Sequence, residues 1–411
     1  MLSKVFFGIN IFAKDTPPMH KYFAVSYLTF MVIITSCTKE EFKPKAKDTN
    51  QYLLESKHHY QFSGRIMGAI AKGYLAKEQN YKFENVDAIK LTYRTHSINN
   101  TNIDASGIIL IPETDGSLPI LSYQHQGYLD QKIKAPSLTI IGSNELTFAA
   151  MIASTGYIVL VADYIGYGDS SQEVHPFEHK ASLAQSGLDF IEASKEYFKE
   201  NGIRNNIKIS LAGYFEGAPI TLAMHQLMER KEDISIDKCI AGEGLLLKKK
   251  WVKNVLNNNQ NEKELTYLLK LIQSYKTIYP KLSFGWNHYL KEDYAENIEM
   301  GTPIDSIELN MVLPESVFNS NFSDGILSGE DTDFIYALKQ NEISPWETNT
   351  PIVLFYNDKG PSHLLDQAKS FQNSFNVYQT SIKLRLNKKC SDENPILPFA
   401  IQVIKELHDV Q

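Results

Sequence analysis

The 411-residue sequence has little cysteine, no dense block of basic residues and no long apolar run. Three cysteines are too few for a disulfide scaffold in a chain of this length. Lys and Arg number 41 against 48 Asp and Glu, and this acidic balance argues against nucleic acid as the main partner. We expect neither a metal nor a cofactor, because no Cys/His cluster has zinc spacing and no glycine-rich phosphate loop occurs. The 43% hydrophobic and 22% charged residues are typical of a folded chain with one or two domains.

The N-terminal region carries a short uncharged segment at residues 22–37. A membrane-spanning helix needs about 20 apolar residues, so this segment reads as a secretory signal peptide instead. Its end, residues 34–37 (Ile-Thr-Ser-Cys), resembles the lipobox of bacterial lipoproteins, in which the cysteine is lipidated. We predict that residues 1–36 are a signal peptide, with Met19 as the candidate true start, and that Cys37 carries the lipid. The alternative is a plain signal peptide in which Cys37 is incidental.

The residues after the signal suit a tether. Residues 37–60 are polar and rich in Lys and Glu, which favours a flexible linker between the lipid and the folded domain. Residues 38–41 (Thr-Lys-Glu-Glu) are similar to a signal that sends lipoproteins of some Gram-negative bacteria to the cell surface. Several acyl chains on Cys37 would suffice for stable anchoring. We therefore expect an exported protein that is anchored to the outer membrane, with the short motif implying display at the cell surface.

Strand and helix patterns alternate through residues 61–411. Apolar runs such as residues 157–162 and 351–356 are typical of parallel strands that are buried on both faces. Further strands are predicted at 86–93, 105–112, 119–125, 207–212, 236–241 and within 377–386, and helices at 144–156, 178–200, 216–230, 362–374 and from Pro395. Residues from about 245 to 345 break this rhythm with short helices and loops. The prediction is an α/β domain with a mostly parallel central sheet flanked by helices and a helical cap insertion.

The turn after predicted strand 207–212 carries two glycines four residues apart. Residues 211–218 read Leu-Ala-Gly-Tyr-Phe-Glu-Gly-Ala. This resembles the nucleophile elbow Gly-x-Ser-x-Gly of the α/β hydrolases, in the strand-turn-helix setting that the motif requires. Gly213 and Gly217 meet the need for tiny residues around a strained central one. The central position is Phe215, and a phenyl ring cannot attack a carbonyl.

Three other segments extend the resemblance. Residues 156–170 are similar to the fourth-strand segment of that fold, and residues 123–127 (Tyr-Gln-His-Gln-Gly) to the strand end that opens into the oxyanion loop. Residues 175–177 (His-Pro-Phe) precede a helix, as in the secretory lipases. The elbow of that branch reads Gly-Tyr-Ser-Glu-Gly-Gly, and four of its six positions match residues 213–218. The resemblance runs from about residue 85 to 408 and implies a lipase or esterase fold with a cap.

The same resemblance assigns the remaining site positions. His125, Gln126 and Glu216 become candidates for the oxyanion loop. The family's acid position falls on Gly360, with Asp358 two residues early. The position of the family's histidine falls on Cys390.

The mapped triad is therefore Phe215, Gly360 and Cys390, in which none of the three catalytic roles is filled. A serine without a base is a poor nucleophile, and a base without a serine has nothing to activate. The first hypothesis is a lipase-like protein that has lost ester hydrolysis and binds an apolar ligand, a lipid or a partner beneath its cap. The second is an active carboxylesterase or lipase, with Asp358 in place of the acid or a dyad at residues 362–363 (Ser-His). The third is a structural lipoprotein whose pocket has collapsed.

Three smaller predictions concern individual side chains. A bulky residue at positive φ is strained, so Phe215 should lie in a relaxed turn or pack its ring into the old substrate site. Cys239 and Cys390 are expected to be free thiols, since they lie on segments two strands apart. Residues 248–250 (Lys-Lys-Lys) are expected to form a solvated helix face rather than a basic patch.

Overall fold

The computed structural model describes residues 50–73, 75, 81–127, 137, 144–231, 235–257, 262–309, 312–358, 362–378, 380–387 and 396–409. The predicted signal peptide, Cys37, Gly360 and Cys390 lie outside these residues. The domain begins at Asn50, and its first strand, β1 (Leu53–Phe62), pairs antiparallel with β2 (Val86–His96). The prediction that the tether extends to residue 60 is therefore wrong. The physical reason is that β1 is an edge strand whose middle residues are polar and exposed, so it reads as a linker.

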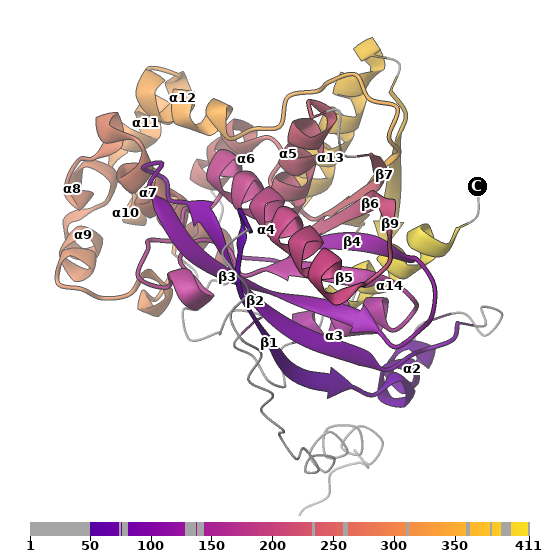
Figure 1. Ribbon diagram of the computed structural model, residues 1–411. Coiled ribbons are helices and arrows are strands. Elements are labelled where there is room, and N and C mark those ends of the chain that lie inside the picture. Colours follow the sequence, from indigo (N-terminus) through magenta and orange to yellow (C-terminus); the bar gives the residue numbers. More distant parts are fainter. Residues whose placement is uncertain are drawn as a thin grey trace, which may run out of the picture. The chain divides into compact units, whose positions relative to one another are not determined.

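Among the described residues, nine strands form one sheet in the order β1-β2-β3-β5-β4-β6-β7-β8-β9 (Figure 1). The other strands are β3 (Asn102–Pro112), β4 (Leu118–Gln124), β5 (Ile158–Ala162), β6 (Asn205–Tyr214), β7 (Ile236–Gly242), β8 (Ile352–Asn357) and β9 (Ile382–Asn387). The first three strands and β5 pair antiparallel, whereas β5, β4 and β6 to β9 pair parallel. The predicted mostly parallel sheet is confirmed. Strand β5, an interior strand of this sheet, is buried at every residue, as its continuous apolar run indicates.

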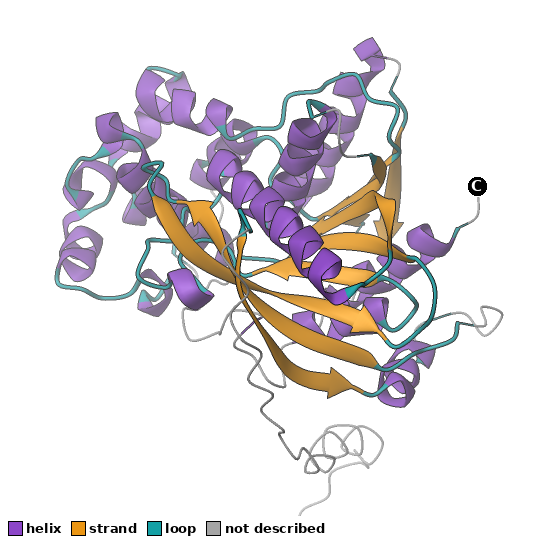
Figure 2. Cartoon of the chain, in the orientation of Figure 1, coloured by secondary structure: helices purple, strands orange, loops and turns teal. Residues whose placement is uncertain are grey.

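Helices cover both faces of the sheet (Figure 2). One face carries α4 (Lys180–Asn201), α5 (Gly217–Glu229) and α13 (Ser362–Ser374), and the other carries α2 (Gly64–Lys72), α3 (Asn144–Ala153) and α14 (Ile396–His408). Each helix directs an apolar side toward the sheet, so two separate apolar cores sandwich the strands. None of the helices described is long and apolar enough to cross a membrane.

A helical insertion lies between β7 and β8 and forms the cap. Its helices are α6 (Lys248–Leu256), α7 (Glu262–Ile278), α8 (Trp286–Tyr289), α9 (Glu292–Glu299), α10 (Pro314–Val317), α11 (Ser320–Ser328) and α12 (Thr332–Gln340). Phe322 contacts Tyr289 and Phe334 edge-to-face, and all three rings are buried within the cap. The buried face of α7 packs into the same apolar core as α4 and α5, which joins the cap to the sheet domain.

Candidate functional site

The turn between β6 and α5 keeps the backbone of a nucleophile elbow. Phe215 has a φ of 56°, the left-handed conformation that a bulky residue rarely adopts. Its N–H donates to Gly242 O at 2.9 Å, and its carbonyl accepts the N–H of Ala218 at 3.1 Å. A Cβ at Gly213 would overlap Gly217 O, and one at Gly217 would overlap Gln124 O. The turn has therefore not relaxed around the phenyl ring.

The ring of Phe215 packs beneath the cap. It meets the ring of Tyr267 in α7 edge-to-face, with centroids 5.0 Å apart and planes at 84°. Tyr267 also contacts Phe177 at 4.5 Å and Trp251 at 5.8 Å. These four rings form an aromatic cluster between elbow and cap, in the edge-to-face geometry that aromatic pairs favour.

The predicted oxyanion-loop residues follow β4 and are engaged with neighbouring groups. His125 is buried and stacks on Tyr164 at 4.0 Å, and its Nδ1 lies 2.7 Å from Gln126 O, which requires the Nδ1–H tautomer. Burial lowers the pKa of His125 to about 4, so its ring is neutral near pH 7. The backbone N–H of Gln126 donates to Glu145 Oε1 at 2.6 Å. These contacts fit a loop-orienting role for His125 and occupy one N–H that an oxyanion would need.

Glu216, the residue after Phe215, ties the elbow to the segment before α4. Its buried Oε1 accepts the N–H of Glu178 at 2.9 Å and lies 3.2 Å from His175 Nε2. Burial alone would raise the pKa of Glu216, but His175 and the Glu178 N–H outweigh burial and lower that pKa. Glu216 is therefore a buried, ionised carboxylate with its partners in place.

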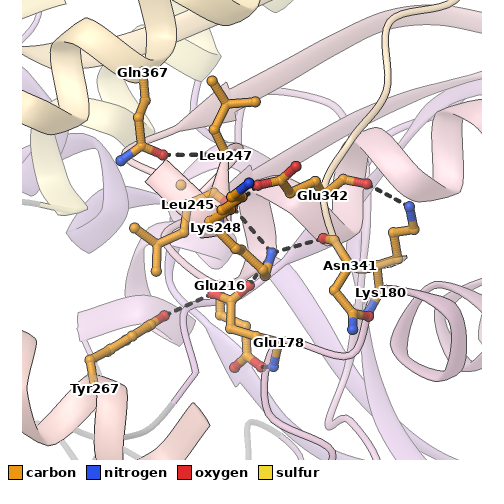
Figure 3. A network of polar contacts seen from close by, with 12 residues as sticks. Glu178, Lys180, Glu216, Leu245, Leu247, Lys248, Tyr267, Asn341, Glu342 and Gln367 are labelled. Atoms are coloured by element: carbon orange, nitrogen blue, oxygen red, sulfur yellow. Dashed lines mark hydrogen bonds and ion pairs between the residues drawn. The ribbon is translucent and has the colours of Figure 1, made fainter. Parts of the chain in front are cut away.

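A second buried carboxylate links this segment to the cap (Figure 3). Glu178 has a φ of 59°, and its Oε2 lies 2.7 Å from Lys248 Nζ, with both side chains fully buried. Its Oε1 accepts the hydroxyl of Tyr267 at 3.0 Å. The expectation of a solvated face at residues 248–250 is wrong for Lys248, because a carboxylate partner allows its ammonium to be buried. Lys250, two residues on, is exposed.

Comparisons with known proteins agree with this architecture. Residues 131–230 match the family model described as secretory lipase. A solved structure from Legionella pneumophila is 20% identical, with a TM-score of 0.76 over 88% of this chain and all of that one. The rice cell wall degrading esterase LipA from Xanthomonas oryzae is 22% identical, with a TM-score of 0.69 over 86% and 95% of the two chains. The fold is that of the α/β hydrolases.

Candida antarctica lipase A is a more distant structural neighbour of this chain, with 16% identity, a TM-score of 0.59 and coverage of 86% and 82% of the two chains. No curated protein sequence matches the chain. The matched residues 131–230 include the elbow, so the family match covers the segment in which Phe215 stands. The predicted resemblance to the secretory lipases is confirmed.

Other predicted site residues lie at the end of β8 and beyond. Asp358 is exposed, and its N–H donates to Asn387 O at 3.2 Å. His363, one half of the hypothetical dyad, lies 2.5 Å from Glu264 of α7 through its Nε2 and thus contacts the cap. Cys239 is a buried free thiol, as predicted. Among the side chains that the structure describes, no group of three or more His, Cys, Asp or Glu could hold a metal ion.

Sequence reasoning missed two features of this site. The pairing of Glu178 with Lys248 joins residues 70 positions apart, and neither residue lies in a motif that would signal it. Glu243 directly follows β7, has a φ of 53° and accepts a hydrogen bond from the N–H of Asn357. Burial raises the pKa of Glu243 to about 7, more than the Asn357 N–H lowers it. The only sequence signal for Glu243 is its place at the carboxyl end of an apolar strand, next to the elbow.

Proposed function

We propose that this α/β hydrolase does not hydrolyse esters and acts as a lipid-anchored binding protein. The observation that carries the proposal is Phe215 at the centre of an intact elbow. The left-handed turn and its flanking glycines support an elbow at this position, in which Phe215 takes the place of the serine of Gly-x-Ser-x-Gly. A phenyl ring has no lone pair with which to attack a carbonyl, so the acyl-enzyme step has no nucleophile.

Two further features support the loss of hydrolysis. The N–H of Gln126 is committed to Glu145, and the neutral, stacked ring of His125 is not placed as a base. By the family resemblance, the acid and base positions are Gly360 and Cys390, which supply neither function. Ester hydrolysis by the family mechanism would therefore need changes at several positions at once.

The binding role rests on the aromatic cluster and on the predicted anchor. The rings of Phe177, Phe215, Trp251 and Tyr267 pack on one another beneath the cap, and they would line a site for an acyl chain or an apolar segment of a partner protein if the cap moved. Cys37, as the lipidated residue, would hold the domain on the outer membrane with exposure at the cell surface. Incorporation of labelled palmitate tests the anchor, and a Cys37→Ser variant that still incorporates it would contradict the proposal.

The second candidate function is an active carboxylesterase with an unconventional triad. The match of residues 131–230 to the secretory lipases and the structural likeness to an esterase and a lipase favour it. It requires a hydroxyl or thiol within about 3 Å of a basic nitrogen near the elbow.

A hydrolysis assay separates the two candidates. The purified protein and its Phe215→Ser variant are incubated with p-nitrophenyl butyrate and p-nitrophenyl palmitate, beside a preparation from cells that lack the gene. We expect no release of p-nitrophenol above that background from either protein, since a serine alone restores no base. Turnover by the unaltered protein that rises with its concentration and is abolished by a serine-reactive phosphonate would establish the esterase instead.

The binding role is tested separately by titration with a fluorescent fatty acid and by mass spectrometry of lipids that copurify. Saturable binding that weakens in Tyr267→Ala supports the aromatic site. If neither a lipid nor a protein partner binds, the third hypothesis, a structural lipoprotein whose pocket has collapsed, is supported instead.

A further inference from the structure

The ammonium group of Lys248 is buried at the point where the cap leaves the sheet domain. Lys248 is the first residue of α6. Its ammonium donates to Leu245 O at 3.1 Å and to Asn341 O at 3.0 Å, and it forms an ion pair with Glu178 Oε2 at 2.7 Å. Two backbone carbonyls therefore hydrogen-bond the ammonium, and the Glu178 carboxylate neutralises its charge. Leu245 and Asn341 lie at the two ends of the cap, so moving the cap away would separate Lys248 from Glu178 and leave the Glu178 carboxylate without its counter-charge, a costly change in a protein interior.

Both oxygens of the Glu178 carboxylate contact residues of the cap. Oε2 pairs with Lys248 of α6, and Oε1 accepts the hydroxyl of Tyr267 of α7. The backbone of Glu178 is left-handed, a conformation that persists only where surrounding contacts enforce it. Its N–H is held by Glu216 of the elbow. A continuous polar path therefore runs from the elbow through Glu178 to two helices of the cap (Figure 3).

The far end of the cap joins the same network. Asn341, directly after α12, accepts the N–H of Lys180 on its Oδ1 at 3.1 Å, and its own carbonyl binds Lys248. Glu342 accepts the Lys180 ammonium on its carbonyl at 2.5 Å and the N–H of Lys249 on its carboxylate at 2.7 Å. The first and last residues of the cap are thus fastened to each other and to the start of α4.

We propose that Glu178, Lys248 and Tyr267 form a latch that keeps the cap closed over the elbow. An apolar interface alone tolerates sliding, because dispersion contacts have little directionality. The latch instead requires one position of α6 and α7, since each oxygen of the Glu178 carboxylate contacts a different helix of the cap. Closure by the latch is independent of the side chain at the elbow and of whether the domain hydrolyses or binds.

Thiol labelling on the buried face of α7 tests the latch. Ser274 lies two helical turns after Tyr267 on the same face, is 2% exposed, and has no hydrogen-bond partner for its hydroxyl among the described residues. Ser274→Cys is therefore a nearly isosteric probe. Its alkylation by iodoacetamide is followed by peptide mass spectrometry, alone and together with Glu178→Gln or Lys248→Met. Cys239, fully buried in β7, reports unfolding of the whole domain in the same sample.

We expect the introduced thiol to be protected while the latch is intact and to react at least about tenfold faster in both latch variants. Cys239 should stay protected, and the matched change Lys250→Met at an exposed neighbour should alter neither rate. Fast labelling with the latch intact, or equally slow labelling without it, overturns the proposal. If both latch variants also expose Cys239, the milder Tyr267→Phe decides. It should accelerate labelling of the introduced thiol alone, and an unchanged rate overturns the proposal.

Discussion

Replacing Phe215 by alanine and, separately, by glycine tests whether the elbow is left-handed. Both variants lose the same half-buried ring and its contact with Tyr267, which should lower the free energy of unfolding by about 2 to 3 kcal/mol in each. Apart from the methyl group of alanine, the two variants differ in the backbone conformations that they favour. Alanine at a φ of 56° retains the left-handed cost of about 1 to 2 kcal/mol, which glycine does not bear. Glycine in turn loses about 0.4 to 1 kcal/mol through the greater entropy of its unfolded chain.

Taken at the middle of these two ranges, the difference leaves Phe215→Gly more stable than Phe215→Ala by about 0.8 kcal/mol, the reverse of the order at ordinary helix and strand positions. Urea denaturation of the two variants measures it, because equal slopes allow the midpoints to be compared directly. Matched variants at Phe198, buried in α4 with helical backbone, provide the control and should show alanine as the more stable. An alanine variant at 215 that is as stable as the glycine variant or more so would refute the left-handed elbow.

Three further predictions concern buried ionisable groups. Lys248→Met leaves the Glu178 carboxylate buried without a counter-charge and should lower the free energy of unfolding by about 3 to 5 kcal/mol. The control change Lys250→Met, at an exposed residue, should lower it by less than about 0.5 kcal/mol. Similar urea midpoints for the two variants would contradict this prediction. Burial raises the pKa of Glu243 to about 7 from an ordinary value of 4.5, so the folded state holds a proton that the unfolded state has lost, and stability should fall as pH rises from about 4.5 to 7. Glu243→Gln should remove that part of the slope, and parallel stability curves for variant and parent would count against it. Burial also raises the pKa of Cys239, so alkylation of its thiol at pH 8 should require urea, and rapid labelling of the native protein would show a different environment.

The fold was predictable because its central strands are continuous apolar runs. Residues 158–162 and 352–356 are buried throughout, and a run of that length between turn residues has few alternatives to a parallel strand. The first strand escaped detection for the opposite reason. In β1 the residues from Glu55 to Lys57 are exposed at the edge of the sheet. They are polar and lack the apolar pattern of a strand, so the sequence does not reveal their pairing with β2.

The elbow was predictable from spacing, whereas the network around it was not. Positions 213 and 217 must be glycine because backbone carbonyl oxygens lie where a Cβ would be, and this requirement is visible in the sequence as two glycines four residues apart. Lys248 lies in a run of three lysines that looks solvated, and its burial depends on Glu178, a partner brought near only by the fold. Sequence patterns record which residues are charged and omit which counter-charge will neutralise them.

The left-handed turn at Phe215 has an evolutionary consequence. Its geometry is set by the N–H bond to Gly242 and by the close packing of Gly213 and Gly217, none of which involves the side chain at position 215. The strained backbone of the elbow is therefore held by its surroundings, independently of the side chain at position 215. A serine codon lies one nucleotide away from a phenylalanine codon. On such a scaffold, a substitution at the central position can replace hydrolysis by ligand binding, or the reverse, without a change in the main chain.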